Sequence, residues 1–361
     1  MTEHMTNLQQ IIKGERAVFF IAEIGKNFIQ TKEEQSREQY LKNAKELILK
    51  AKEAGADAVK FQTHNVEDEQ IDLRVVSPHF SGADRYSWVK RNNEITTREF
   101  WQEIKSYCQE QGVTFFSTPM SRGAAMLLEG IGVPFWKVGS ADILDFVMLD
   151  YLAGTGKPII LASGMSSLEE IDRSVEFLKK RGSPLILLYC VSKYPCPPED
   201  LRLGTINFFQ KRYNIPVGFS DHSLGIEAAI AAAGLGAVVI EKHFSLSRNL
   251  WGSDHKVSIT PEEYAQMVET IRKGVPARAS VEEPEKFLTD DELALRPIFR
   301  KALVAGADLK AGDILTKENI YAMRPQAYID GLPSEDYERV LGKKLTKDLK
   351  KYCPLTGDIL D

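Results

Sequence analysis

The chain of 361 residues has little of what marks disulfide-rich, secreted or membrane proteins. Its cysteines number four, and no pair has CxxC spacing, so a disulfide framework is excluded. No run approaches the ~20 consecutive apolar residues of a membrane helix. The polar start "MTEHMTNLQQIIKGER" lacks the apolar centre of a signal peptide. We therefore expect a cytoplasmic protein with reduced thiols and no membrane partner.

An excess of basic residues is also missing. The net charge is -5, which argues against nucleic acid or an anionic membrane as the main partner. A local basic pocket stays possible. Hydrophobic residues make up 43% of the chain and charged residues 27%, which excludes wholesale disorder. The length suits one large domain followed by a small one.

Short, nearly continuous apolar runs recur along the first two thirds of the chain. Such runs are typical of parallel strands that are buried on both faces. We expect eight of them, at residues 17–25, 58–63, 114–119, 135–140, 158–164, 185–190, 216–222 and 237–243. The segments between them have helical spacing and helix caps, as in "SSLEEIDRSVEFLKKRG" and "TPEEYAQMVETIRKG". Eight strand–helix units in succession predict a (β/α)8 TIM barrel.

Ionisable and hydroxyl side chains stand at or near the ends of most of these strands. In a barrel of this kind the active site lies at the carboxyl ends of the strands. A purely structural barrel would not need such groups there, although any single one could be a solvated loop residue. The residues concerned are Glu23, Lys60, Gln62, Ser117, Thr118, Lys137, Ser140, Ser163, His222 and His243.

Two histidines end neighbouring strands, in "GFSDHSLG" and "VVIEKHFS". Two neutral imidazoles can bind a divalent transition metal and leave positions open for substrate, which suits a Lewis acid. We therefore predict that His222 and His243 are metal ligands. Asp221 and Glu241 are expected to orient the imidazoles. The alternative is that a histidine merely makes one hydrogen bond at a strand end.

Three lysines interrupt the apolar runs. Lys60, Lys137 and Lys242 would be costly to bury without an anion. If they converge on the barrel mouth, they predict a site for a phosphate or carboxylate ligand. Two other roles stay open. One lysine could form a Schiff base with a carbonyl substrate, or each could pair with a neighbouring carboxylate.

The alternation of apolar strands and helices ends after the last predicted helix of the barrel. We divide the chain into a catalytic barrel at 1–280, a charged linker with helical pieces at 281–298, and a compact β-rich domain at 299–361. About sixty residues suffice for such a domain.

Nine short motifs in order resemble the sialic acid synthase family. They are "IAEIG", "GADAVKFQTH", "FFSTP", "KVGSAD", "ASGM", "YPCPPEDLRL", "GFSDHSLG", "EKHF" and "WGSDHKVS". The family includes N-acetylneuraminate, legionaminate and pseudaminate synthases, which condense phosphoenolpyruvate with a sugar. The tail "LKAGDILTKENIYAMRP" resembles the antifreeze-like (SAF) domain that ends those enzymes. The resemblance spans residues 16–361.

The resemblance implies a reaction and a set of site residues. Carbon 3 of phosphoenolpyruvate attacks the aldehyde of an open-chain N-acyl hexosamine, water adds at carbon 2, and phosphate leaves by C–O cleavage. A divalent metal, commonly Mn²⁺ with Mg²⁺ or Co²⁺ as options, binds the two histidines. The implied catalytic residues are Glu23, Asp142, His222 and His243. The implied phosphoenolpyruvate contacts are Lys60, Thr118, Lys137, Ser140, Ser163 and Ser220. The implied sugar contacts are Gln62, Tyr194, Asp254 and Arg324.

Arg324 also implies an assembly. In the family, an arginine of the SAF domain reaches into the sugar site of the partner subunit, which implies a domain-swapped homodimer. Two departures leave the acceptor sugar open. Asp142 stands where several bacterial members have Glu, and Ser192 stands where neuraminate synthases tend to have Asn. His255 is a third histidine, which we expect to contact the sugar or support the site.

Two other functions compete with this one. The first is a different barrel enzyme, either a related deoxy-sugar acid synthase or a lysine Schiff-base aldolase; the SAF-like tail argues against it. The second is a non-catalytic carbohydrate-binding barrel, which would bind sugar without releasing phosphate. The presence of Glu23, His222 and His243 together argues against this second function.

Overall fold

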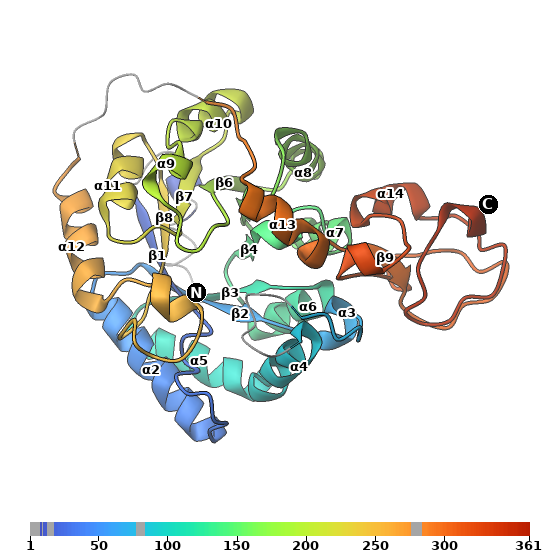
Figure 1. The fold of residues 1–361 in the computed structure, drawn as a ribbon, viewed down its shortest axis with the longest axis horizontal. Helices are drawn as coiled ribbons and strands as arrows, with labels where there is room; N and C mark the ends of the chain where they lie inside the picture. The colour runs from blue at the N-terminus through green and yellow to red at the C-terminus, as the bar shows by residue number, and fades with distance from the viewer. Residues whose placement is uncertain (1–7, 9, 13–17, 77–83, 276–283) are drawn as a thin grey trace.

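The computed structural model describes residues 8, 10–12, 18–76, 84–275 and 284–361. Eight parallel strands hydrogen-bond in the order β3-β2-β1-β8-β7-β6-β5-β4, and β3 and β4 at its two ends lie beside each other. The predicted TIM barrel is confirmed (Figure 1). Its strands are β1 (Phe19–Gly25), β2 (Ala58–Thr63), β3 (Thr114–Pro119), β4 (Trp136–Val138), β5 (Ile159–Ala162), β6 (Leu185–Cys190), β7 (Val217–Asp221) and β8 (Val239–His243).

Helices cover the outside of the sheet. Their ends follow the sequence signals: α8 begins at a capping box of Ser167 and Glu170, and α12 begins with Pro261 behind a capping box of Thr260 and Glu263. The helices of the barrel are α2 (Arg37–Glu53), α3 (Val66–Glu69), α4 (Arg85–Ile95), α5 (Arg98–Gln111), α6 (Arg122–Ile131), α7 (Phe146–Gly154), α8 (Leu168–Lys180), α9 (Pro198–Leu201), α10 (Thr205–Tyr213), α11 (Glu227–Gly234) and α12 (Pro261–Arg272), with the 3-10 turns η1 (Ser140–Asp142) and η2 (Asp254–Val257).

Several predicted strands are longer than the observed ones. The run expected at 135–140 gives β4 at Trp136–Val138, and the run at 158–164 gives β5 at Ile159–Ala162. The residues that follow are partly buried after β4 and buried after β5, so the apolar pattern of each strand continues beyond its end. Ser140 therefore lies in η1 and Ser163 follows the end of β5. Residue 17, where the first predicted strand begins, lies outside the described residues.

The tail forms a lobe at one side of the barrel (Figure 1). The helix α13 (Asp290–Phe299) joins it to the barrel, and β9 (Ala302–Ala305) pairs antiparallel with β10 (Ile320–Met323). Short turns complete the lobe: η3 (Gln326–Tyr328), η4 (Ser334–Asp336), α14 (Tyr337–Val340) and η5 (Gly357–Ile359). The linker expected at 281–298 thus contains most of a helix. The three-part division itself stays a prediction.

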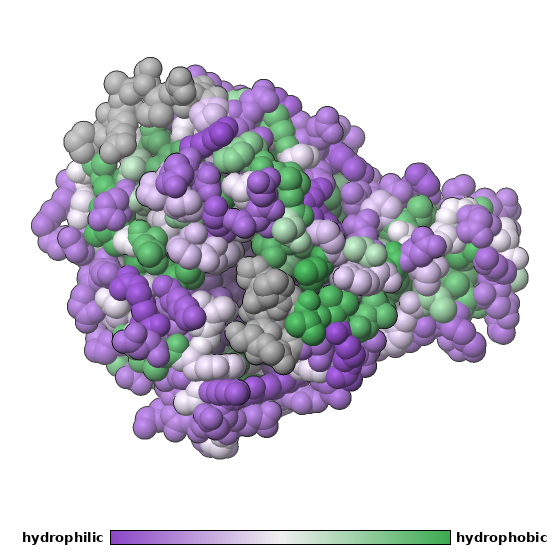
Figure 2. All heavy atoms as spheres, viewed as in Figure 1, coloured by the Kyte–Doolittle hydropathy of each residue, from purple (hydrophilic) through white to green (hydrophobic). Residues whose placement is uncertain are grey.

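Hydrophilic residues cover most of the face of the molecule seen in Figure 2. Among the described residues, we find no helix with the length and apolar character needed to cross a membrane.

Candidate active site at the carboxyl ends of the strands

The two histidines meet at the mouth of the barrel. His222 directly follows β7 and His243 is the last residue of β8, and their ring centroids lie 5.7 Å apart. The carbonyl oxygen of Val191 lies 2.7 Å from Nδ1 of His222, so that nitrogen carries the proton and donates it. The other nitrogen, Nε2, then presents its lone pair, and it lies 3.0 Å from the hydroxyl of Tyr194.

Burial, followed by the nearby His243, lowers the pKa of His222 to about 3. The imidazole is therefore neutral at physiological pH, as a metal ligand must be. Nδ1 of His243 is buried and makes no hydrogen bond within the part of the chain that the structure describes.

The residues present fit a metal held by two protein ligands. Across the described ranges, no cluster of three or more His, Cys, Asp or Glu side chains could hold a metal by itself. A two-histidine site would leave its remaining positions to substrate and water, as catalytic metal sites do.

Charged groups from neighbouring strands are aligned beside the histidines. Glu23 of β1 pairs in register with Lys60 of β2 on one side and with His243 of β8 on the other. Nζ of Lys60 lies 2.6 Å from Oε2 of Glu23 and 3.7 Å from Oε1 of Glu241, and it donates a hydrogen bond to Thr118 at 3.2 Å. The structure therefore brings these predicted site residues together.

Lys137, the second lysine of the mouth, also lies beside Glu241. Nζ of Lys137 lies 3.7 Å from Oε1 of Glu241. Burial would lower the pKa of Lys60, but Glu23 and Glu241 outweigh it, and the pKa is raised. Burial also lowers the pKa of Lys137, and there Glu241 only partly opposes the effect. Lys60 and Lys137 are therefore two buried cations with the carboxylate of Glu241 between them. A ligand with two negative charges would give each ammonium an anionic partner of its own.

Lys242 does not join this anion site, which corrects the expectation of three converging lysines. Its Nζ lies 2.6 Å from Oδ2 of Asp221, and neither side chain is exposed. Side chains alternate along a strand, so the mouth-facing Glu241 and His243 place Lys242 on the outer side of the barrel.

The same alternation corrects the role expected for Asp221 and Glu241. Asp221 bonds Lys242 and Ser223 rather than an imidazole. Glu241 accepts a hydrogen bond from Ser220 at 3.1 Å and faces the lysines. The group that orients His222 is the backbone carbonyl of Val191.

The two remaining serines expected to bind phosphoenolpyruvate lie where the loops after β4, β5 and β6 meet. Oγ of Ser140 lies 3.3 Å from Sγ of Cys190, and Oγ of Ser163 donates to the carbonyl of Leu188 at 2.9 Å. Gly164 lies between them.

Three groups at the sugar side converge on Gly25, which has a left-handed φ of +53°. A Cβ added there would lie 3.1 Å from Oε1 of Glu23, 3.2 Å from Nε2 of Gln62 and 3.7 Å from Oδ2 of Asp254. Gln62 donates to Glu23 at 2.9 Å. Lys26, which sequence reasoning missed, donates to the carbonyl of Gln62 at 2.8 Å, and burial lowers its pKa to about 7.

Arg324 and Asp142 lie together inside one chain. The guanidinium of Arg324 bonds Asp142 and lies 3.6 Å from Glu69, and all three side chains have no exposure. Arg324 was expected in the sugar site of a partner subunit; here it lies against its own barrel, because the tail packs on loops of the same chain. The domain-swapped homodimer stays a prediction.

His255, expected to contact the sugar or support the site, contacts two neighbouring loops. Its Nδ1 lies 2.6 Å from Oγ of Ser245, its Nε2 lies 3.5 Å from the carbonyl of Ile29, and the side chain is buried. Sequence reasoning also missed Glu292 of α13. Only the capping box "TDDE" gave a local signal for it, and that signal describes a helix start.

Comparison with known proteins agrees with this geometry. The NeuB family profile matches residues 47–283 and the SAF domain profile matches residues 300–360. Human N-acetylneuraminate-9-phosphate synthase is 32% identical over 97% of this chain and 94% of its own length. The pseudaminic acid synthase of Campylobacter jejuni serotype O:2 is 31% identical over 93% of this chain and 94% of its own.

A solved structure is similar over nearly the whole chain. The spore coat polysaccharide biosynthesis protein spsE of Bacillus subtilis has a TM-score of 0.76, 29% identity, and 96% coverage of both chains.

An uncharacterized protein of Methanocaldococcus jannaschii is 37% identical over 84% of this chain and 86% of its own. Because the two profiles together span most of the chain and full-length relatives exceed 30% identity, this chain belongs to the NeuB family and carries a C-terminal SAF domain.

Proposed function

We propose that this protein condenses phosphoenolpyruvate with the open-chain aldehyde of an N-acyl hexosamine. The acceptor is N-acetylmannosamine or a 2,4-diacetamido-trideoxyhexose, and the products are a nine-carbon 2-keto acid and phosphate. The observation that carries the proposal is the row of Glu23, Lys60 and His243 on three neighbouring strands, with Lys137 and His222 beside it.

In the proposed step, carbon 3 of phosphoenolpyruvate forms a bond to the aldehyde carbon, the C=O π bond breaks, and the aldehyde oxygen takes a proton from solvent to become a hydroxyl. Water adds at carbon 2, and the C–O bond to phosphate then breaks, so the electron pair leaves with phosphate. Lys60 and Lys137 hold the anionic groups of phosphoenolpyruvate, with the hydroxyls of Thr118 and Ser220 as further donors. Holding both substrates at one mouth supplies the proximity that a two-substrate reaction needs.

Glu23 is placed to move a proton. Its carboxylate accepts from Gln62 and pairs with Lys60, so it stands between the sugar side and the phosphoenolpyruvate side of the mouth. In our proposal it takes the proton of the water that adds at carbon 2. A divalent metal on His222 and His243, Mn²⁺ by preference, would supply Lewis-acid polarisation of the aldehyde carbonyl.

The test is phosphate release from phosphoenolpyruvate with Mn²⁺, run against N-acetylmannosamine, its 6-phosphate and 2,4-diacetamido-2,4,6-trideoxyhexoses. Mass spectrometry identifies the product. Release with one sugar only, lost on chelation, supports the proposal and names the acceptor. Turnover that resists chelation, with borohydride trapping at Lys137, would support a Schiff-base aldolase instead. Sugar binding without phosphate release would contradict an enzymatic role.

A further inference from the structure

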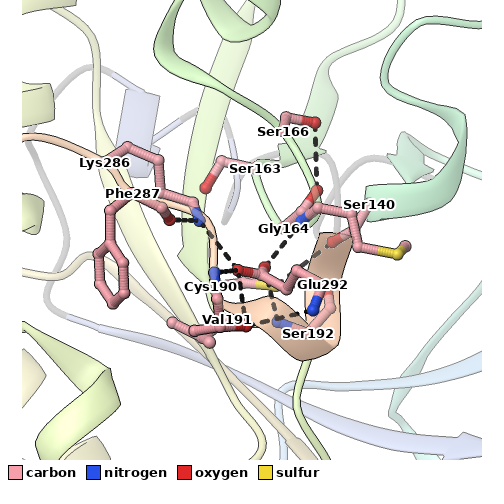
Figure 3. A network of polar contacts seen from close by, with 12 residues as sticks. Ser140, Ser163, Gly164, Ser166, Cys190, Val191, Ser192, Lys286, Phe287 and Glu292 are labelled. Atoms are coloured by element: carbon pink, nitrogen blue, oxygen red, sulfur yellow. Dashed lines mark hydrogen bonds and ion pairs between the residues drawn. The ribbon is translucent and has the colours of Figure 1, made fainter. Parts of the chain in front are cut away.

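The helix α13, between the barrel and the tail, places one carboxylate inside the barrel mouth. Oε1 of Glu292 accepts hydrogen bonds from the backbone N–H of Met165 at 2.8 Å and of Ser192 at 2.9 Å (Figure 3). Met165 belongs to the loop after β5, and Ser192 belongs to the loop after β6. One oxygen atom therefore ties two neighbouring loops of the mouth together.

The carboxylate of Glu292 is buried and fully hydrogen-bonded at this position. It has no solvent exposure, and burying a carboxylate is costly unless its oxygens are hydrogen-bonded. Its second oxygen accepts from the N–H of Thr289 at 3.1 Å. The same oxygen lies 3.4 Å from Nζ of Lys286 (Figure 3). With the hydroxyl of Thr289 at 3.4 Å from the same oxygen, five donors contact the carboxylate, which is more than the start of a helix needs.

The two loops pack against each other beside Ser140 and Ser163. Gly164, beside Met165, packs so tightly that an added Cβ would lie 2.2 Å from Oγ of Ser192, 2.6 Å from Oγ of Ser140 and 2.8 Å from Sγ of Cys190. Figure 3 shows Gly164, Ser140, Cys190 and Ser192 gathered around the carboxylate of Glu292. A shift of the loop after β5 would move Ser163 relative to Ser140, and the loop after β6 packs directly against it.

The same helix holds Met165 from its other side. The carbonyl of Met165 accepts from Arg296 of α13 at 2.8 Å and from Arg300, the residue directly after α13, at 2.7 Å. Met165 has a φ of +53°, which is unfavourable for a residue with a side chain and persists only where its surroundings hold it. Residues of α13 and the residue after it therefore hold both peptide groups that flank the Cα of Met165.

We propose that Glu292 is a positioning residue, which sets the loops after β5 and β6 for the phosphate of phosphoenolpyruvate and so makes α13 part of that subsite. The inference rests on the proposed function, because it takes phosphoenolpyruvate as the ligand. Glu292 acts through Met165, Ser192 and the serines beside them, and has no role in the chemistry itself.

The experiment compares Glu292→Gln and Glu292→Ala with Asp290→Asn, a matched control at an exposed acidic residue in the first turn of the same helix. Calorimetry on the full chain measures binding of phosphoenolpyruvate, and phosphate release gives both KM values and kcat. We expect Glu292→Gln to weaken phosphoenolpyruvate binding about tenfold or more, since a charge-assisted hydrogen bond is worth about 1.5–3 kcal/mol. The sugar KM and the control should stay within about twofold. A fall in kcat alone, with both KM values unchanged, would mean a merely structural role and overturn the inference.

Hydrogen exchange tests the loop contact without turnover. In Glu292→Gln, the amides of Met165 and Ser192 should exchange about tenfold faster than in Asp290→Asn, with the barrel strands unchanged. Equal exchange in the two variants overturns the contact. If the wild-type chain binds no phosphoenolpyruvate, the proposed function and the subsite assignment fail together, and the exchange result still decides whether Glu292 holds the loops. If the alanine variant does not fold, the glutamine variant alone decides.

Discussion

Arg324 of the tail and Asp142 after β4 form an ion pair in which neither side chain touches solvent. They are 182 positions apart in the chain. Glu69 lies 3.6 Å from Nη1 of Arg324, and Nζ of Lys301 lies 3.0 Å from Oδ1 of Asp142. Charges of alternating sign therefore form the contact between barrel and tail.

Replacement of Arg324 by methionine should lower the free energy of unfolding by about 3–5 kcal/mol. Removing one partner of a buried pair leaves the other charge buried and uncompensated. The double variant Asp142→Asn/Arg324→Met should lose less than the sum of the two single variants. Urea unfolding of all four proteins measures this coupling, and simple additivity would show that the pair is not coupled.

The variant Tyr194→Phe should bind Mn²⁺ about two- to tenfold more tightly than the wild-type chain. The hydroxyl of Tyr194 occupies the lone pair of Nε2 of His222, and a metal must displace it. One hydrogen bond is worth about 0.5–1.5 kcal/mol, which gives that factor. Calorimetry with Mn²⁺ alone checks it, with the exposed Tyr352→Phe as the control. Affinity equal to or below wild type would argue against Nε2 as the metal ligand.

The variant Lys60→Met should raise the KM for phosphoenolpyruvate about tenfold to a hundredfold and leave the sugar KM nearly unchanged. Its ammonium stays charged in the mouth and makes the contacts that phosphoenolpyruvate would replace. Steady-state kinetics measures both KM values. Lys50→Met, on the exposed face of α2, serves as the control. Equal effects on the two substrates would contradict the anion site.

The stability of the protein should fall as the pH drops from 6.5 to 4. Burial lowers the pKa of His64 to about 4, so over this range the unfolded chain binds a proton that the folded chain does not. The loss from His64 is up to about 3 kcal/mol, at 1.36 kcal/mol for each unit of pKa difference.

The variant His64→Gln isolates this loss, since its side chain does not titrate and can still donate to Glu69. Urea unfolding at pH 7 and pH 4.5 measures the difference for both proteins. The variant should lose less stability between the two values than the wild type. The same loss in both would show that His64 does not carry the effect.

Much of the fold and of the mouth could be predicted from the sequence, because buried parallel strands appear in it as nearly continuous apolar runs. The carboxyl ends of these strands meet at the barrel mouth, so the sequence alone predicts that Glu23, Lys60 and His243 lie close together. What a strand end does not reveal is the face on which a side chain lies. Lys242 was misplaced for that reason, since one residue along a strand exchanges the mouth for the outer side.

Contacts between distant segments could not be predicted in the same way. In the sequence, Glu292 is typical of a residue in the first turn of a helix. Nothing in the sequence around its partners, Met165 and Ser192, predicts a contact with it. Arg324 was recognised as a site residue only through resemblance, and its partners Asp142 and Glu69 depend on how the tail packs. Such contacts come from tertiary arrangement and leave no local periodicity.

The bond between Glu292 and the two loops also sets an order of events on the ribosome. Met165 lies 127 positions and Ser192 lies 100 positions before its partner in the chain. At about 5–20 residues per second, the loop at Ser192 is made roughly 5–20 s before Glu292 exists. The eighth strand ends at His243, so at the same rate all eight strands exist roughly 2–10 s before Glu292 is made. A message truncated before α13 would yield the eight strands without the contact that Glu292 makes to the loops after β5 and β6.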